Sequence, residues 1–397
     1  MSIQWIDSPE LDLQGKRIFC RFDFNVPMTE SGEITDDTRI KAALPTLNYL
    51  MEKGARIIIA SHLGRPKGKP KASLSLEPVA ARLQQLLQKD ITFAEDCVGD
   101  GVRKLVQDLL PGSILVLENL RFNSGEERND EGFSKMLSLG YEVYMNDAFG
   151  AAHRAHASTE GTTRFIPVRL GGFLMRKEID ALTAICKHPK KPFVAILGGA
   201  KVSDKIGVLS SLLQKVDKLI IGGAMAYTFL KAKGQNIGTS RFEEDRLLTA
   251  QSILKKAAQT GIEILLPVDH VVVENFNSDS PTHIVTGEIL DDTMGVDIGP
   301  KTQKLFAEAI PEEGTVFWNG PMGVTEWDAC FAGTRAIAER IAHTQTFSVV
   351  GGGDSLMALQ KTGLSEHISH VSTGGGASLE FIEGAQLPGL VALGYEF

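Results

Sequence analysis

Short apolar runs alternate with amphipathic stretches along almost the whole chain. The runs are rich in β-branched residues and are continuously apolar, as in Ile57-Ile58-Ile59. Strands of this kind are buried on both faces, which is typical of parallel sheets covered by helices. We predict strands over residues 18–26, 56–62, 114–122 and 142–148 in the first half of the chain, and over 193–198, 218–222, 263–273, 315–318, 347–351 and 368–372 in the second.

Helical periodicity fills the intervals between these runs. Val79, Leu83, Leu86 and Leu87 recur at helical spacing and predict a helix over residues 78–89. Alternating strands and helices predict an α/β fold in which parallel sheets are flanked by helices, as in Rossmann-like domains. Further helices are predicted over 174–187, 241–260 and 204–216, the last of them with Ser203 as its N-cap.

The length of the chain, 397 residues, favours two domains over one, because a single core rarely grows beyond roughly 250 residues. Gly171-Gly172 precedes the predicted helix 174–187, and a segment with two prolines, 188–192, follows it. We therefore predict an N-terminal domain over 1–170, a connecting helix or hinge over 171–190 and a C-terminal domain over 191–383.

Charge and cysteine content exclude several classes of protein. The 41 Lys and Arg against 49 Asp and Glu give a net charge of -8, which argues against nucleic acid or an anionic membrane as the main partner. A local basic site for a small anion stays possible. The four cysteines form no C-x-x-C pair, and the N-terminus carries no apolar signal segment. We expect a reduced, cytoplasmic protein.

Basic side chains follow the predicted strands of the first half. In open parallel sheets, ligands bind beyond the carboxyl ends of the strands, so these side chains should converge. A single arginine at such a place is usually a solvated surface residue, but several at successive strand ends favour a site. Arginine binds phosphate or carboxylate through two hydrogen bonds, and Asp23 and Asn25 add partners for a hydroxyl group. The basic residues are Arg21 or Arg39, His62 with Arg65, Arg121, and Arg154, which His153 and His156 flank as expected supporting residues.

Glycine clusters follow the predicted strands of the second half. The chain has 40 glycines in 397 residues, about 10% against a typical ~7%. Glycine lets backbone N–H groups approach an anion, and a helix N-terminus adds partial positive charge, so such clusters are typical of nucleotide phosphate sites. The clusters lie at residues 198–201, 222–223, 320–323, 351–355 and 374–378.

Charged residues beside these glycines extend the nucleotide hypothesis. Lys201 and Lys205 are four residues apart, so we expect both on one face of the following helix. Asp354 follows three glycines and is suited to Mg²⁺ that is shared with nucleotide phosphates. Glu326 follows a Gly-Pro turn and could accept hydrogen bonds from ribose hydroxyls.

Motifs for other chemistries are missing from the sequence. Leu379 stands where a dinucleotide fingerprint needs its third glycine, which argues against an NAD-dependent dehydrogenase. No nucleophile elbow, H-E-x-x-H motif or Ser-His-Asp arrangement is present. Phosphoryl transfer fits this absence, since it depends on positioning and charge neutralisation.

The motifs together resemble the phosphoglycerate kinase family, in family order over essentially the whole chain. The resemblance implies an ATP-dependent transferase of glycolysis with two similar-sized domains, a cleft between them and a hinge. It implies reversible, Mg²⁺-dependent transfer of a phosphoryl group from 1,3-bisphosphoglycerate to ADP, directly and in line. The matching segments are 21–27 (RFDFNVP), 61–66 (SHLGRP), 118–122 (ENLRF), 146–156, 198–205 (GGAKVSDK), 318–324 (WNGPMGV), 351–355 (GGGDS) and 374–378.

The resemblance also assigns residues to roles. Arg39, Lys205, Gly352 and Gly375 would surround the moving phosphoryl group, and Asp354 would hold Mg²⁺. The glycerate would contact Asp23, Phe24, Asn25, Arg39, His62, Leu63, Gly64, Arg65, Arg121 and Arg154. The nucleotide would contact Gly199, Ala200, Lys201, Lys205, Gly295, Asn319, Pro321, Glu326, Gly352, Gly353, Asp354 and Ser355.

Three further expectations complete this interpretation. Family members fold the end of the chain back onto the first domain, which predicts a tail over 384–397. The family usually has Phe where this chain has Thr325, so packing beside the nucleotide should differ. We expect a monomer that acts on small molecules. The alternative is a non-catalytic nucleotide- or anion-binding protein on the same scaffold, against which the presence of Arg39, Lys205 and Asp354 argues.

Overall fold

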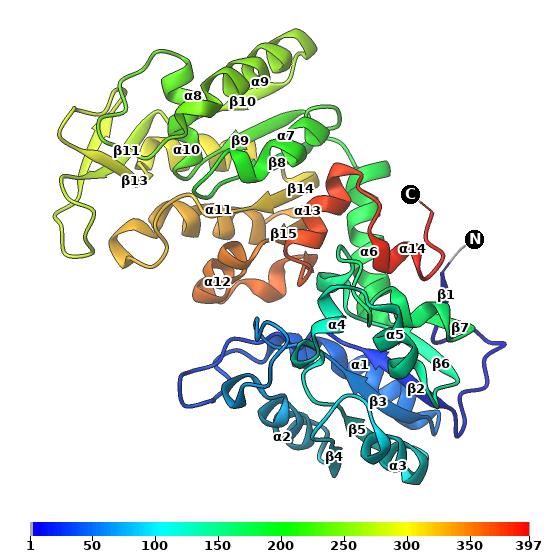
Figure 1. Ribbon diagram of the computed structural model, residues 1–397. Coiled ribbons are helices and arrows are strands. Elements are labelled where there is room, and N and C mark those ends of the chain that lie inside the picture. Colours follow the sequence, from blue (N-terminus) through cyan, green and yellow to red (C-terminus); the bar gives the residue numbers. More distant parts are fainter. Residues whose placement is uncertain (1–2, 397) are drawn as a thin grey trace. The chain divides into compact units, whose positions relative to one another are not determined.

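The computed structural model describes residues 3–396, and the chain divides into two compact units (Figure 1). The first unit contains the chain up to Asp180 and again from Gln386, and the second contains Ala181–Ala385. The boundary falls inside helix α6 (Phe173–Lys187), which the predicted connecting segment 171–190 contains.

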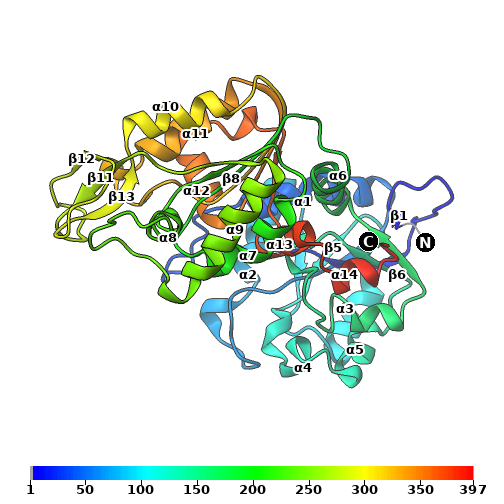
Figure 2. The same cartoon turned by 90° about the horizontal axis from the view of Figure 1, so that it is seen from above.

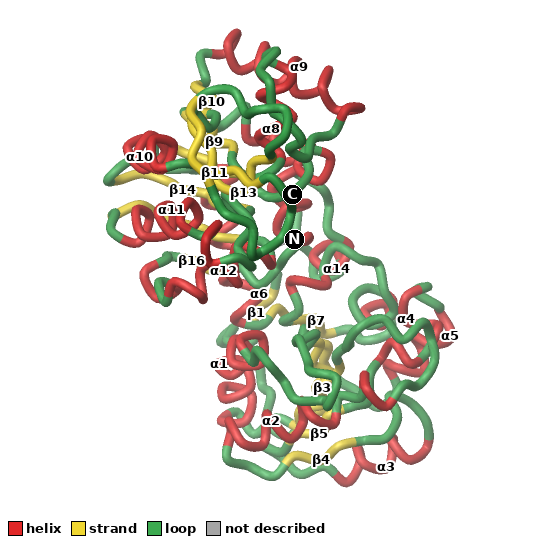
Figure 3. Tube along the Cα trace, turned by 90° about the vertical axis from the view of Figure 1, so that its left-hand side faces the viewer, coloured by secondary structure: helices red, strands yellow, loops and turns green. Residues whose placement is uncertain are grey.

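A seven-stranded parallel sheet forms the centre of the first unit, so the predicted α/β class is confirmed. Alternate apolar residues of β2, such as Ile18 and Cys20, pack against α1 and α2, while Phe19 stacks on Tyr144 on the other face. Figure 3 shows α1 and α2 on one side of these strands and α4 and α5 on the other. The strand order is β1 (Gln4–Trp5), β7 (Val168–Gly171), β6 (Val143–Asn146), β2 (Arg17–Arg21), β3 (Arg56–Ala60), β5 (Ile114–Val116) and β4 (Ile91–Phe93). The helices are α1 (Thr38–Glu52), α2 (Glu77–Leu87), α3 (Asp100–Asp108), α4 (Ser124–Glu127), α5 (Glu131–Ser138) and the short 3₁₀ turns η1 (Ala72–Leu74), η2 (Leu120–Phe122), η3 (Phe149–Ala151) and η4 (Gly161–Arg164).

A six-stranded parallel sheet forms the centre of the second unit. Its core contains the fully buried Trp318 and residues of α10 and α11 such as Phe306 and Ile337. The strand order is β10 (Glu263–Leu265), β9 (Lys218–Ile221), β8 (Phe193–Leu197), β14 (Glu313–Asn319), β15 (Gln345–Gly351) and β16 (His370–Val371). The helices are α7 (Ile206–Leu212), α8 (Met225–Ala232), α9 (Leu247–Thr260), α10 (Pro300–Ala309), α11 (Ala332–Ala342), α12 (Gly353–Thr362), α13 (Gly376–Glu383) and the 3₁₀ turns η5 (Ser203–Lys205), η6 (Glu244–Arg246), η7 (Asp328–Cys330) and η8 (Ser365–His367).

A small antiparallel sheet, which the sequence did not predict, completes the second unit. It contains β12 (His283–Thr286), β11 (Asp269–Val273) and β13 (Met294–Ile298), which lie together near α10 (Figure 2). The single strand predicted over 263–273 is therefore wrong. Pro267 lacks an N–H group for a sheet ladder, and the chain changes sheets there.

The predicted helix over 204–216 begins later than expected. Helix α7 starts at Ile206, and Ser203 lies in the preceding 3₁₀ turn, where its hydroxyl donates to Glu243 at 2.6 Å instead of capping the helix. The predicted N-cap is therefore wrong. Lys201 and Lys205 both precede α7, so they do not share a face of that helix.

The last turn of helix, α14 (Pro388–Val391), packs within the first unit. The Gly389 N–H donates to the carbonyl oxygen of Ala152 at 2.8 Å, and Leu390 is fully buried. Residues 384 and 385 of the tail predicted over 384–397 belong to the second unit, and Phe397 lies outside the described residues.

Within residues 3–396, no helix is both long enough and apolar enough to cross a membrane.

Truncation of the buried anchor of α14 should destabilise the first unit. We expect Leu390→Ala to lower the free energy of unfolding by about 2–5 kcal/mol, because it leaves a cavity where the side chain is fully buried. The neighbouring Val391→Ala is the control, since Val391 is 48% exposed. Urea unfolding measures both changes. If both variants lowered the free energy of unfolding by the same amount, the packing of α14 through Leu390 would be contradicted.

Candidate active site

Four loops of the first unit begin at one edge of the sheet. They follow β6, β2, β3 and β5, which are adjacent and parallel, so their carboxyl ends lie side by side. Arg39, at the start of α1, donates to Asp23 at 2.8 Å, and Nδ1 of His62 lies 3.9 Å from the same carboxylate. The structure thus brings together groups from the loops after β2 and β3 and from the start of α1.

Gly64 is the point where three of these loops meet. Its N–H donates to the side-chain oxygen of Asn25 at 2.8 Å, and its carbonyl accepts from Arg121 at 2.8 Å. Asn119 adds a second link, because its side chain donates to the carbonyl of Leu63 at 2.7 Å. These bonds fix the backbone around the predicted glycerate-binding groups.

The cationic side chains differ in their availability to a ligand. Arg21 is only 1% exposed and donates into the interior, whereas Arg39 is half-buried, so Arg39 is the better placed of the two residues that the sequence left open. Arg65 is exposed, and Arg154 is half-buried with its Nε 3.1 Å from His153 Nε2. Phe24 and Leu63 are buried in the core, so only their backbones can meet a ligand.

Several positive charges lie close together at this edge of the sheet, where burial and their mutual repulsion lower the pKa values of basic groups. Burial holds the pKa of His62 well below its usual range, and the nearby charges of Arg21, Arg121 and Arg39 lower that pKa further, so His62 is neutral at pH 7. Burial also lowers the pKa of Arg121, which Glu127 at 3.5 Å counteracts. An anionic ligand would relieve the repulsion among these groups.

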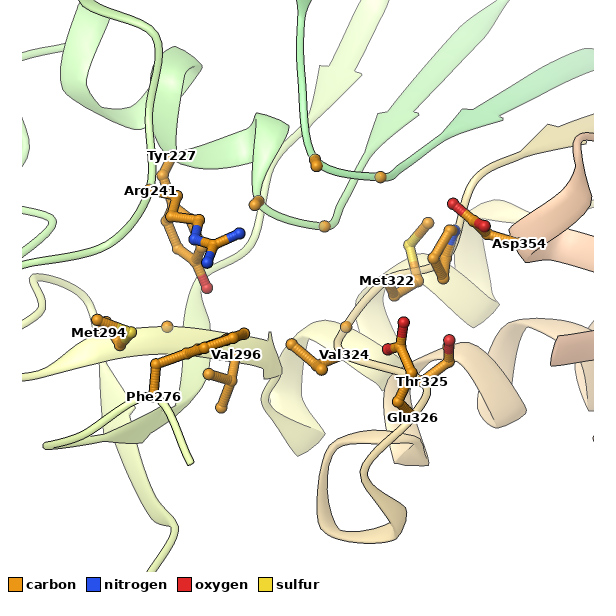
Figure 4. A pocket seen from close by; sticks show the side chains of 17 residues that line it. Tyr227, Arg241, Phe276, Met294, Val296, Met322, Val324, Thr325, Glu326 and Asp354 are labelled. Carbon is orange, nitrogen blue, oxygen red and sulfur yellow. The ribbon is translucent and has the colours of Figure 1, made fainter. Parts of the chain in front are cut away.

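A pocket in the second unit lies among the glycine loops and the small sheet (Figure 4). It encloses about 860 Å³ when the solvent in its open mouth is included. Figure 4 shows Arg241 and Tyr227 on one side and Asp354 on the other. Of the predicted nucleotide contacts, Gly199, Ala200, Gly295, Pro321, Glu326 and Asp354 line this pocket.

Close backbone packing explains several of the glycines at the pocket. A Cβ atom on Gly198 would lie 2.1 Å from the carbonyl oxygen of Pro321, and one on Gly223 would lie 2.5 Å from the backbone nitrogen of Gly199. Helix α12 starts at Gly353 directly after Gly352, whose φ of +94° favours glycine. Its first N–H groups have no partners within the helix and are available to an anion.

Lys205 and Asp354 supply the charged groups beside these loops. Burial lowers the pKa of the Lys205 ammonium, and the negative charges of Asp204 and Asp354 oppose this effect. Among residues 3–396, no three His, Cys, Asp or Glu side chains are grouped to hold a metal ion. Asp354 nevertheless fits Mg²⁺, because its exposed carboxylate lines the pocket and Mg²⁺ commonly takes one carboxylate with substrate phosphates and water.

Two predicted nucleotide contacts hold the glycine loops in place. The side chain of Asn319 donates to the carbonyl of Gly351 at 2.7 Å, and the hydroxyl of Ser355 accepts from the Gly320 N–H at 2.5 Å. Asn319 and Ser355 are almost fully buried. Their visible role is therefore to link the loop after β14 to the start of α12.

One wall of the pocket consists of residues that were not predicted from the sequence. Tyr227, Arg241, Phe276 and Met294 line it, and the guanidinium of Arg241 lies 4.7 Å from the ring centroid of Phe276. These residues come from separate segments and carry no shared motif, so no local signal could have grouped them. Thr325, at the position where Phe was expected, also lines the pocket, and its carbonyl accepts from Lys361 at 3.2 Å.

Asp297 ties the pocket strand β13 to helix α11, and its protonation should make stability depend on pH. Its carboxylate accepts from the N–H groups of Gly333 and Ile298, each at 2.8 Å, while burial raises its pKa to about 7. Since the folded protein holds this proton more tightly than the unfolded chain, the stabilisation is complete below about pH 4 and is lost as pH rises through 7.

We expect the stability of the native protein, relative to Asp297→Asn, to fall by about 2–3 kcal/mol between pH 5 and pH 8. Denaturant unfolding at several pH values measures this difference. Asp292→Asn, which removes an exposed carboxylate of the same unit, is the matched control and is measured in the same way. A difference independent of pH for Asp297→Asn would contradict the raised pKa.

Comparison with known proteins identifies the family of this chain. The family model for phosphoglycerate kinase matches residues 8–385. The chain is 52% identical to phosphoglycerate kinase from Picosynechococcus sp., covering 97% of both chains, and 52% identical to cytosolic phosphoglycerate kinase from Triticum aestivum, covering 97% of this chain and 96% of the other. It also matches the structure of phosphoglycerate kinase from Coxiella burnetii with a TM-score of 0.88 and 40% identity, over 99% of both chains. The chain with these two sites belongs to the phosphoglycerate kinase family.

Proposed function

We propose that this chain catalyses the reversible, Mg²⁺-dependent transfer of a phosphoryl group from 1,3-bisphosphoglycerate to ADP, giving 3-phosphoglycerate and ATP. The observation that carries the proposal is the pairing of two different anion sites in one member of this family. The first unit carries a cluster of cationic side chains, and the second carries a pocket lined by glycine-rich loops.

The glycerate binds, in this proposal, to the polar edge of the first unit. Arg39, Arg65, Arg121 and Arg154 bind its phosphate and carboxylate oxygens through paired hydrogen bonds. The remaining contacts would come from side chains and backbone at Asp23, Phe24, Asn25, His62, Leu63 and Gly64. The neutral state of His62 suits a hydrogen-bond donor rather than a further fixed charge.

The nucleotide binds in the pocket of the second unit. The base lies toward Gly295, and the ribose hydroxyls donate to Glu326. The phosphates accept hydrogen bonds from Lys201, Lys205 and the first N–H groups of α12. Gly199, Ala200, Asn319, Pro321 and Gly352–Ser355 are the other proposed contacts, and Asp354 would hold Mg²⁺, which supplies positive charge to the phosphate oxygens when bound.

Transfer is direct in this mechanism and needs no covalent intermediate with the enzyme. Arg39 and Lys205 neutralise the charge of the moving phosphoryl group, and the N–H groups at Gly352 and Gly375 add hydrogen bonds where charge develops. These groups belong to both units, and in this mechanism a hinge movement brings the two ligands within reach of each other before chemistry. Closure also excludes water, which would otherwise compete with ADP as the acceptor.

The proposal also covers the oligomeric state and the cellular location of the enzyme. Its substrates are small molecules, and we propose that it works as a monomer in the cytoplasm. The relative described as cytosolic supports this location. The absence of paired cysteines in the sequence agrees with a reducing compartment.

Removal of either proposed catalytic cation should abolish most of the activity. We expect Arg39→Ala and Lys205→Ala each to lower kcat by roughly 10³–10⁵-fold, the range found when a transition-state arginine is lost from other phosphoryl-transfer enzymes. A coupled assay with 3-phosphoglycerate and ATP measures both variants and, on the native protein, turnover itself. Arg103→Ala and Lys256→Ala, at exposed positions of the same two units, serve as controls.

Two results would contradict different parts of the proposal. A near-native kcat in either variant would remove that residue from the catalytic step. Ligand binding without turnover by the native protein would favour the non-catalytic alternative on the same scaffold.

A further inference from the structure

Glu126 is a fully buried carboxylate to which the mechanism above gives no role. It lies in α4 and accepts two hydrogen bonds from one residue, the Ser158 hydroxyl at 2.6 Å and the Ser158 N–H at 3.0 Å. Burying a carboxylate costs free energy unless cations and donors compensate it. Because this cost must be compensated, we asked which neighbouring groups Glu126 stabilises.

The positive charges of Arg21 and Arg121 both compensate Glu126, and Ser158 links Arg21 to it directly. The Nε of Arg21 donates to the Ser158 hydroxyl at 2.8 Å, and its Nη1 donates to the carbonyl of Phe22. The same hydroxyl donates to Glu126, so one serine joins the two buried charges. Arg21 is held on two sides, which fixes the direction of its third nitrogen.

That third nitrogen, Nη2, lies 3.1 Å from Nδ1 of His62. A guanidinium can only donate, so Nδ1 must accept, and the proton of the neutral imidazole then resides on Nε2. The Asp23 carboxylate, 3.9 Å from Nδ1, would favour a proton on Nδ1, but the hydrogen bond from Arg21 is shorter. The other charged or titratable groups that act on His62, namely Arg39, Arg121 and His156, disfavour its charged form.

We propose that Glu126 and Ser158 are positioning residues that act through Arg21 to hold His62 as a neutral imidazole with its proton on Nε2, ready to donate to the anionic substrate. The opposite tautomer would present a lone pair at Nε2, which repels phosphate or carboxylate oxygens. The identity of that substrate, but not the tautomer, rests on the proposed function.

The test combines a tautomer measurement with ligand binding. In ¹⁵N-imidazole NMR at pH 7, with His62 assigned from the spectrum of His62→Asn, we expect the native protein to show the Nε2–H form. Ser158→Ala and Glu126→Gln should convert His62 to a mixture of tautomers, a change that a merely structural role would not produce. Both variants should raise the Kd for 3-phosphoglycerate about tenfold in calorimetry, which corresponds to the loss of one modest hydrogen bond, and should leave the Kd for ADP unchanged.

Ser134→Ala is the matched control, because it removes the same atom from a buried serine of the first unit. The Ser134 hydroxyl has no hydrogen-bond partner among residues 3–396, so this variant should keep both the tautomer and the affinity. If Glu126→Gln fails to fold, the native spectrum and Ser158→Ala still decide the question.

Three results separate this inference from the proposed function. An Nδ1–H tautomer in the native protein, or an unchanged tautomer and affinity in Ser158→Ala, would overturn the positioning role. A native protein that shows the Nε2–H form, loses it in Ser158→Ala and yet fails to bind 3-phosphoglycerate would contradict the proposed substrate and support the control of the tautomer.

Discussion

Neighbouring parallel strands end along one edge of their sheet, and both sites of this protein depend on that geometry. In the first unit, the loops after β6, β2, β3 and β5 bring positive side chains to one edge, where they repel one another. Acidic side chains, some near the surface and one in the interior, counteract this repulsion. Asp23 pairs with Arg39 near the surface, Glu127 lies beside Arg121, and Glu126 compensates Arg21 in the interior. The positive edge of this sheet is thus balanced by acidic residues, of which Asp23 is also a proposed ligand contact, whereas Glu126 is fully buried.

The candidate anion site of the second unit differs from that of the first in the groups that it offers to a ligand. Its parallel strands end in glycine-rich loops, so in the proposed function backbone N–H groups add to the side-chain cations Lys201 and Lys205 as donors. Backbone donors need no counter-charge, but they need close packing, which Gly198 and Gly223 allow. The buried side chains of Asn319 and Ser355 then hold these loops in register. A nucleotide with a metal ion is suited to such donors, whereas a small free acid is better bound by arginine.

Much of the fold and part of the candidate site could be predicted from local patterns. Continuous apolar runs such as 56–62 identified most strands of the parallel sheets, but β1, β4 and β7 of the first sheet were not predicted. The residues after the predicted strands identified the groups that meet at Gly64. The antiparallel strands β12 (HIVT) and β13 (MGVDI) escaped prediction because neither is a continuous apolar run and both lie outside the strand–helix alternation.

Other features depend on contacts between distant segments, which no local pattern records. Tyr227, Arg241 and Phe276 form one pocket wall from three separate segments. The partner of Ser203 proved to be Glu243, forty residues away, rather than the start of a helix. In the sequence, Glu126 is one of several charged residues in a row and carries no distinguishing signal. Its burial and its hydrogen bond with Ser158 are visible only in the structure.

In the proposed mechanism, cationic side chains and backbone N–H groups supply charge and position, and the phosphoryl group passes directly from one substrate to the other. The stereochemistry at phosphorus tests this most directly. When ATP whose γ-phosphoryl group is made chiral with oxygen isotopes reacts with 3-phosphoglycerate on the native protein, a single in-line transfer should invert the configuration. Retention of configuration would mean two successive transfers through an enzyme-bound intermediate, and would contradict a mechanism based on charge and position alone.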